Sequence, residues 1–110
     1  MNYLPIETET FYYQHIFDSE DNEKLIQHFS VGKMSGQGLE DYLKQLAISE
    51  EEENFARTYL VKDKETHELA SYFTLKTGLF TLEIDEKRFY TVPSIELSNF
   101  AVNSSYRTRL

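Results

Sequence analysis

RTYLVKDKETHELASYFTLKT, residues 57–77, is the stretch that decides the fold. Two runs rich in aromatic and β-branched residues flank a polar segment at 63–68, and this arrangement is typical of a β-hairpin. Gly78 interrupts the second run, at a place where we expect a bulge or a bend. Residues 79–84 then either extend the second strand or begin a new one. The stretch therefore predicts an antiparallel sheet.

One further strand is expected on each side of this hairpin. Residues 10–17 are rich in aromatic side chains, which suits a strand. A charged connector at 85–88 and Pro93 precede the last predicted strand, residues 95–102.

Two helices are expected between the first strand and the hairpin. Asp18 or Ser19 can cap a short first helix. Three apolar side chains then fall on one face of it: Leu25, Ile26 and Phe29. Residues 30–38 contain Gly32, Gly36 and Gly38 and predict a flexible loop before the second helix.

The second helix has the clearest pattern in the chain. Its apolar residues follow an i, i+3, i+4, i+7, i+8 spacing: Leu39, Tyr42, Leu43, Leu46 and Ala47. We interpret this stripe as a face of the core, with a groove for a partner as the alternative. Ser49 and Glu52 match a capping box, so the helix is expected to restart or bend there.

This order of elements predicts an α+β fold, with a mainly antiparallel sheet of about four to five strands and two N-terminal helices. A chain of 110 residues allows one domain, residues 1–110. Nothing follows the last predicted strand to cover its far side, so we expect the domain to be incomplete at its C-terminus.

The chain is acidic, with a formal net charge of −8. Much of the excess lies in residues 18–21 and 50–53, and both runs are expected at helix starts, where negative charge suits the helix dipole. An acidic surface repels phosphate backbones, so nucleic acid is not an expected partner of this segment. The charge favours an amine-bearing, cationic partner, unless the acids only solvate helix faces.

Several classes of site and location are not expected. There is no cysteine, which fits a reducing compartment. The start of the chain, residues 1–5, has neither a basic leader nor an apolar signal core, and no apolar run approaches the ~18 residues of a membrane span. We therefore expect a soluble, cytoplasmic domain without membrane contact. His15, His28 and His67 lie far apart in the sequence, so no metal site is predicted.

Three segments together resemble a known superfamily. Residues 57–63 and 69–75 are similar to the central hairpin of the GNAT N-acetyltransferases, many of which have a pattern like "iaGYytL" there. Residues 95–107, IELSNFAVNSSYR, are similar to their fourth strand and the start of the cofactor loop that follows. A glycine-containing segment before a Leu-rich helix also resembles the toxin-like branch. The resemblance covers residues 10–107.

This resemblance implies a transfer of acetyl from acetyl-CoA to a primary amine. The backbone of Phe100, Ala101 and Val102 would pair with the pantetheine arm in the manner of an added strand. Arg107 would be the first residue of the loop that holds the pyrophosphate with backbone amides.

The sequence departs from the superfamily pattern after Arg107. The first glycine of the loop would fall at position 110, which is Leu110, so either the loop is lengthened or its motif is absent. The helix behind the loop, the fifth strand and a late tyrosine would all come later in the chain. We therefore expect residues 1–110 alone to bind acetyl-CoA poorly and not to turn over.

Glu96 is the candidate general base of this reaction, because the superfamily often uses a carboxylate on the fourth strand. Strict alternation would place it on one face with Ser98, Phe100 and Val102. The alternative is an exposed glutamate or one paired with a lysine. Tyr72 and Ser98 are candidate substrate-side residues, with core packing as the alternative for Tyr72.

Two hypotheses follow for the function. The first is the front part of a GNAT-type acetyltransferase, whose acceptor, a small amine, a peptide N-terminus, a lysine or an aminoacyl-tRNA, stays open. The second is a non-catalytic interaction module that forms a homodimer through the exposed last strand, residues 95–102, because an open edge invites pairing.

Overall fold

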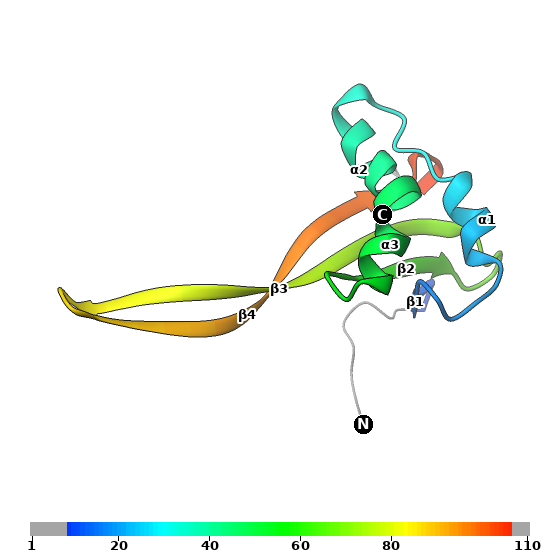
Figure 1. Ribbon diagram of the computed structural model, residues 1–110. Coiled ribbons are helices and arrows are strands. Elements are labelled where there is room, and N and C mark those ends of the chain that lie inside the picture. The colour runs from blue at the N-terminus through cyan, green and yellow to red at the C-terminus, as the bar shows by residue number, and fades with distance from the viewer. Residues whose placement is uncertain (1–8, 107–110) are drawn as a thin grey trace.

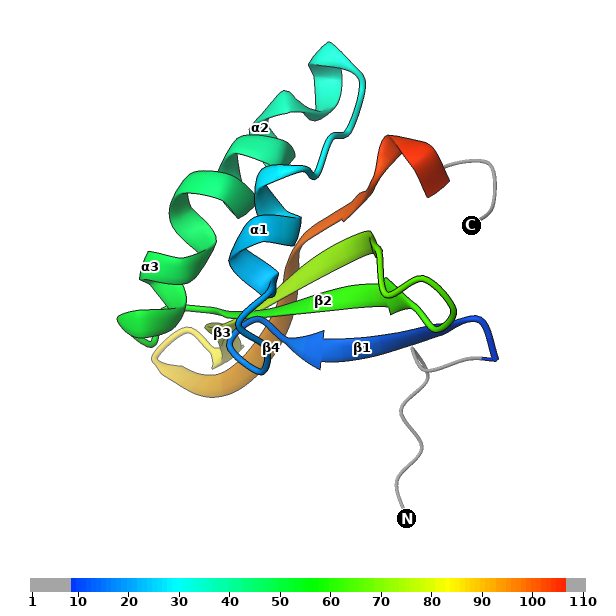
Figure 2. The same ribbon diagram turned by 90° about the vertical axis from the view of Figure 1, so that its right-hand side faces the viewer.

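The computed structural model describes residues 9–106. Its four strands form one antiparallel sheet in the order β1-β2-β3-β4 (Figure 1). Their bounds are β1 Phe11–His15, β2 Arg57–Asp63, β3 Leu69–Asp85 and β4 Arg88–Val102. The helical segments between β1 and β2 cover one face of this sheet (Figure 2). The predicted α+β fold is therefore confirmed.

The helical part begins with α1 (Asn22–Gln27), and a 3-10 turn, η1 (Met34–Gly36), follows it. The predicted second helix forms as three consecutive pieces, α2 (Gln37–Asp41), a π-helical turn η2 (Tyr42–Leu46) and α3 (Ala47–Glu52). A π turn contains more residues than an α turn, so it rotates the side chains that follow it. Leu46 is consequently 48% exposed, although its spacing predicts a core position.

The caps differ from those that the sequence predicts. Asp21, rather than Asp18 or Ser19, is the N-cap residue of α1, and its side chain forms no capping hydrogen bond. Ser49 does not start a helix either, because its hydroxyl donates to the Leu46 carbonyl within the last turns. The acidic run 50–53 therefore lies at the C-terminal end of α3 and not at a helix start.

The core lies between the sheet and the helices and is rich in aromatic rings. Tyr72 on β3 is fully buried, with its ring edge on Phe29 and its face stacked on Tyr42. Its hydroxyl donates to the Leu39 carbonyl over 2.5 Å. Burial raises the pKa of this tyrosine far above its usual range.

β3 and β4 continue beyond the rest of the sheet as a long two-stranded arm, residues 76–97 (Figure 1). Residues 79–84 extend β3, and Gly78 pairs regularly with Ser94 without a bulge. The molecule measures 56 × 37 × 28 Å. The arm exposes large apolar side chains on both faces. These side chains are Leu79, Leu82, Ile84, Phe89, Tyr90, Val92, Ile95 and Leu97.

A β-bulge interrupts β4 at Ser98. Thr74 pairs with Asn99, whereas its neighbour Leu75 pairs with Leu97, so Ser98 is the extra residue of β4. The bulge reverses the alternation of faces on its far side. The prediction that Glu96 shares one face of the strand with Phe100 and Val102 is therefore wrong.

Candidate functional site

β4 is the last strand of the sheet, so one edge of it carries no neighbouring strand among residues 9–106. The Asn103 backbone N–H donates to the Ala70 carbonyl over 2.7 Å, and the Ala101 carbonyl accepts the Ser71 hydroxyl over 2.9 Å. In an antiparallel ladder alternate residues direct their backbone groups to the same neighbour. Since Ala101 and Asn103 turn toward β3, the backbone N–H and C=O groups of Phe100 and Val102 turn outward, along the free edge.

A groove of about 370 Å³ runs beside this outward-facing edge. One wall is the edge itself, at Phe100, Ala101 and Val102. The other wall comes from the segment before and within the second helix. The residues on this second wall are Val31, Lys33, Ser35, Gly36 and Leu39. The groove thus brings together three of the residues that the sequence predicts for cofactor binding.

The wall opposite β4 is held in place by specific contacts. The Val31 backbone N–H donates to Glu40 Oε1 over 3.0 Å, and Lys44 donates to the other oxygen over 3.1 Å. These contacts, the Val31 hydrogen bond first, lower the pKa of the Glu40 carboxyl. Gly36 packs so closely on Val31 that a Cβ there would lie 2.1 Å from Val31 Cγ1. Residues 30–38, for which the sequence predicts a flexible loop, therefore contain a closely packed 3-10 turn, and several of them form a wall of the groove.

The chain that leaves β4 is anchored beside the same wall. The Ser104 N–H donates to the Ser30 carbonyl over 2.7 Å, and a Cβ on Gly32, which has a φ of +76°, would lie 2.9 Å from Ser104 Cβ. Tyr106 in η3 (Ser104–Tyr106) is buried, and its hydroxyl donates to Asp63 over 2.9 Å. Arg107, the predicted start of the pyrophosphate loop, lies outside the described residues.

Glu96 lies on the arm, opposite Lys76 of β3, and is exposed. Because of the bulge it shares the helix-covered face with Ala101, whereas Phe100 and Val102 face the other way. Its carboxylate lies over Gly78, where a Cβ would be 2.9 Å from Glu96 Oε1. Glu96 does not line the groove.

A polar cluster lies on this same face at the base of the arm. Lys76 Nζ is 3.3 Å from Glu50 Oε1 and 5.7 Å from the centre of the Tyr42 ring. The Tyr42 hydroxyl donates to the same Glu50 oxygen over 2.8 Å. Burial, helped by Glu50, raises the pKa of Tyr42 to about 12.

The two predicted substrate-side residues have different surroundings. Tyr72 is opposite Ala101 in the sheet, yet its side chain lies in the core and has no exposed surface. Ser98 is exposed at the bulge, and its hydroxyl donates to the Thr74 carbonyl over 3.3 Å. Lys33 supplies a positive charge to the groove. The sequence does not predict this role, and its only signal there is the position of Lys33 next to Gly32.

Within residues 9–106 no group of three His, Asp or Glu side chains lies close enough to hold a metal ion. None of the helices in that part of the chain is long and apolar enough to cross a membrane.

Comparison with solved structures finds several proteins with a similar fold. A mutant of KacT superimposes with a TM-score of 0.67 at 19% identity, covering 90% of this chain and 60% of that chain. AtaTR bound with acetyl-CoA gives a TM-score of 0.70 at 17% identity, covering 91% of this chain and 60% of that chain. A KacTA–DNA complex gives a TM-score of 0.59 at 22% identity, covering 88% of this chain and 55% of that chain.

These likenesses establish a GNAT-like acetyltransferase fold. The chain spans about 60% of the length of the KacT and AtaTR chains that it resembles. Neither the protein-family models nor the curated protein sequences gave a match.

Proposed function

We propose that the edge of β4 binds acetyl-CoA and that the chain is part of a GNAT-like N-acetyltransferase acting on a primary amine. One observation carries this proposal: the outward-facing backbone groups of Phe100 and Val102 border a groove of about 370 Å³. The GNAT-like fold supports it, and so does the similar AtaTR structure, which is bound with acetyl-CoA.

The residues of the groove fit the chemistry of this ligand. The pantetheine arm contains amide groups, so it can pair with the free N–H and C=O groups of Phe100 and Val102 like an added strand. Val31 and Leu39 provide apolar surface for its alkyl parts, and the Lys33 ammonium is available to a phosphate. Arg107 is proposed to begin the pyrophosphate loop.

Acetyl transfer forms a C–N bond, breaks the C–S bond of the thioester and releases a proton from the amine. We propose Glu96 as the group that takes this proton, directly or through water. The bulge supports this role because it turns Glu96 to the face of Ala101, a wall of the groove. Ser98, exposed beside it, is proposed to meet the acceptor, and the charge of −8 favours a cationic amine.

A proline at position 102 tests the mode of binding. Val102→Pro removes the outward N–H, and an edge strand tolerates this because no ladder bond is lost. In a titration with acetyl-CoA followed by amide NMR, we expect weak binding that Val102→Pro weakens by about fivefold to tenfold. The matched control is Val102→Ala, which keeps the N–H and trims the side chain. Equal binding by the two variants would contradict pairing at this edge.

A non-catalytic role as a dimerisation module is the second candidate. Ile95, Leu97 and Phe100 are 74%, 61% and 54% exposed, and they lie together on the open face of β3 and β4. A second copy that covers this face would bury them. Light scattering should then show a dimer that Ile95→Lys dissociates, while Met34→Lys, at a 93% exposed apolar position elsewhere, leaves it intact. A monomer at high concentration would exclude this role.

A further inference from the structure

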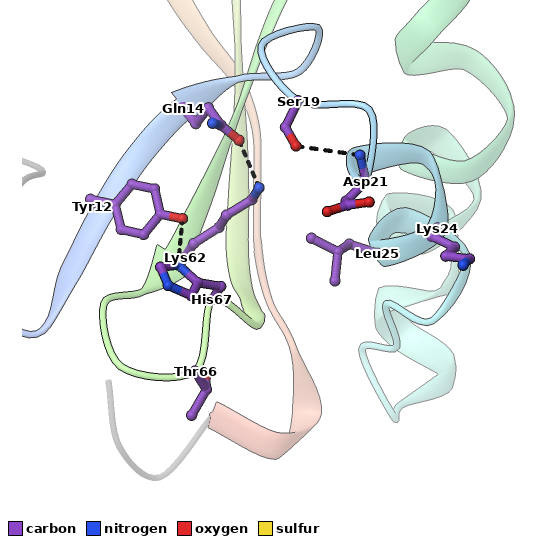
Figure 3. A pocket seen from close by; sticks show the side chains of 9 residues that line it. All are labelled: Tyr12, Gln14, Ser19, Asp21, Lys24, Leu25, Lys62, Thr66 and His67. Atoms are coloured by element: carbon purple, nitrogen blue, oxygen red, sulfur yellow. Dashed lines mark hydrogen bonds between the residues drawn. The ribbon is translucent and has the colours of Figure 1, made fainter.

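A second cavity, of about 430 Å³, lies near the β1 edge of the sheet, whereas the groove at Phe100 to Val102 borders the β4 edge (Figure 3). Side chains from β1, β2, the β2–β3 turn and the start of α1 surround it. None of its residues lines the β4 groove, and the proposed acetyl transfer does not use any of them.

Lys62 supplies a buried positive charge to this cavity. The residue is 4% exposed, and its ammonium donates to Gln14 Oε1 and Asn22 Oδ1, each over 2.6 Å. Both partners are neutral amides, and no carboxylate of residues 9–106 forms an ion pair with Lys62. A lysine ammonium has three N–H donors, so one is left for the cavity. Burial lowers the pKa of Lys62, as expected for a charge without a close counter-ion.

Asp21 supplies a negative charge to the same space. Figure 3 shows its carboxylate on the α1 side of the cavity, across from Lys62. Its charge acts on Lys62, whose pKa it shifts upward against the effect of burial. Within the described part of the chain the Asp21 carboxylate has no ion-pair partner of its own.

The remaining walls add apolar surface and a polar rim. Leu25 and the ring of Tyr12 face the cavity, and the Tyr12 hydroxyl lies 3.1 Å from His67 Nδ1, its hydrogen-bond partner. Lys24 is exposed at the rim. An isolated anion would meet the repulsion of Asp21, and an isolated amine would meet that of Lys62 and Lys24.

We propose that this cavity binds a free α-amino acid, with its carboxylate on Lys62, its ammonium on Asp21 and a modest apolar side chain against Leu25 and Tyr12. A molecule that carries a carboxylate and an ammonium can form an ion pair with Lys62 and with Asp21 at once. It therefore offsets the cost of burying the Lys62 charge without placing a like charge against Asp21. The site is independent of the acetyl-CoA groove.

Amide NMR provides a direct test, because the side-chain NH₂ signals of Gln14 and Asn22 report on the two groups that hold Lys62. The probes are L-leucine, N-acetyl-L-leucine, which lacks the ammonium, L-leucinamide, which lacks the carboxylate, and inorganic phosphate. We expect L-leucine to shift these signals saturably and each of the other probes to bind at least about tenfold more weakly.

Two variants separate ligand binding from folding. Lys62→Met should weaken L-leucine binding by about 10- to 100-fold, whereas Lys87→Met, at an exposed lysine of the arm, should leave it unchanged. If Lys62→Met fails to fold, Asp21→Asn still tests the site, since Asp21 is exposed. It should weaken L-leucine about threefold to tenfold and strengthen the binding of N-acetyl-L-leucine, whose carboxylate no longer meets the repulsion of Asp21.

Three results would overturn the proposal. One is the absence of saturable shifts with L-leucine in a titration into the millimolar range. Another is equal binding of L-leucine and N-acetyl-L-leucine, which would remove the role of Asp21. The third is phosphate binding as tight as that of L-leucine, which would make the cavity a general anion site.

Discussion

Replacement of Glu51 by alanine should destabilise the protein strongly, although this residue belongs to an acidic run at the end of α3. The Glu51 side chain is only 2% exposed. Its Oε1 accepts the buried Thr58 backbone N–H over 2.9 Å, and its Oε2 accepts Arg57 Nη1 over 3.1 Å. His15 Nε2 lies 2.8 Å from Oε1. Glu51 therefore joins α3 to the ends of β1 and β2.

The magnitude follows from these partners. Leaving the Thr58 N–H buried without an acceptor costs about 1–3 kcal/mol. The Arg57 side chain is 60% exposed, so loss of its ion pair adds no more than about 1 kcal/mol. Glu51→Ala should thus lower the free energy of unfolding by about 1–4 kcal/mol, which for a domain of this size lowers Tm by about 4–16 °C.

Urea unfolding followed by circular dichroism measures this loss, with two comparison variants. Glu51→Gln keeps an acceptor for the Thr58 N–H and should cost about 1 kcal/mol or less. Glu52→Ala, at the exposed neighbour, should be within about 0.5 kcal/mol of the wild type. The reasoning is refuted if Glu51→Ala costs less than about 1 kcal/mol, or if Glu51→Gln costs as much as Glu51→Ala.

Three further predictions concern the core and the bulge. Tyr72→Phe leaves the Leu39 carbonyl without its donor and should cost about 1–2 kcal/mol in urea unfolding; a change below about 0.3 kcal/mol would argue against this bond. The pKa of Tyr42 is about 12 in the folded protein, against about 10 in the unfolded chain. Between these two pH values the native state keeps a proton that the unfolded chain loses. The contribution of Tyr42 to the free energy of unfolding should therefore be complete below about pH 10 and fall as the pH rises toward 12. Thermal melts across this range, with tyrosinate absorbance as a second signal, would show no such decline if Tyr42 were solvated. Deletion of Ser98 should remove the bulge and keep the pairs Thr74–Asn99 and Leu75–Leu97 adjacent, with a stability change below about 1 kcal/mol; altered cross-strand NOEs at these pairs would show that the register slips instead.

The parts of the fold that the sequence predicts are those with a local signal. The polar segment 63–68 between two aromatic runs predicts the β2–β3 hairpin, and the apolar spacing from Leu39 to Ala47 predicts a helix. Both signals depend only on neighbours in the chain, so they do not require knowledge of the tertiary contacts.

The features that the sequence does not predict depend on tertiary contacts. A serine in a strand does not signal a bulge, so strict alternation assigns Glu96 to the wrong face. The burial of Glu51 depends on Arg57 and Thr58, which a helical pattern cannot show. The β4 groove is a similar case, because the wall around Lys33 comes from residues that are distant from β4 in sequence. Phe100, Ala101 and Val102 are predicted to bind the cofactor only because the whole strand resembles the fourth strand of the GNAT superfamily.

The turn of the arm, around Glu86 and Lys87, lies far from both termini of the described chain, at the tip of the ribbon (Figure 1). Exposed tips of this kind accept inserted sequence well, because the backbone there makes few contacts that an insertion would break. A fluorescent domain spliced between these two residues would therefore leave the core, the β4 groove and the Lys62 cavity undisturbed. Such a fusion would provide a way to follow the protein in a living cell that spares both ends of the chain.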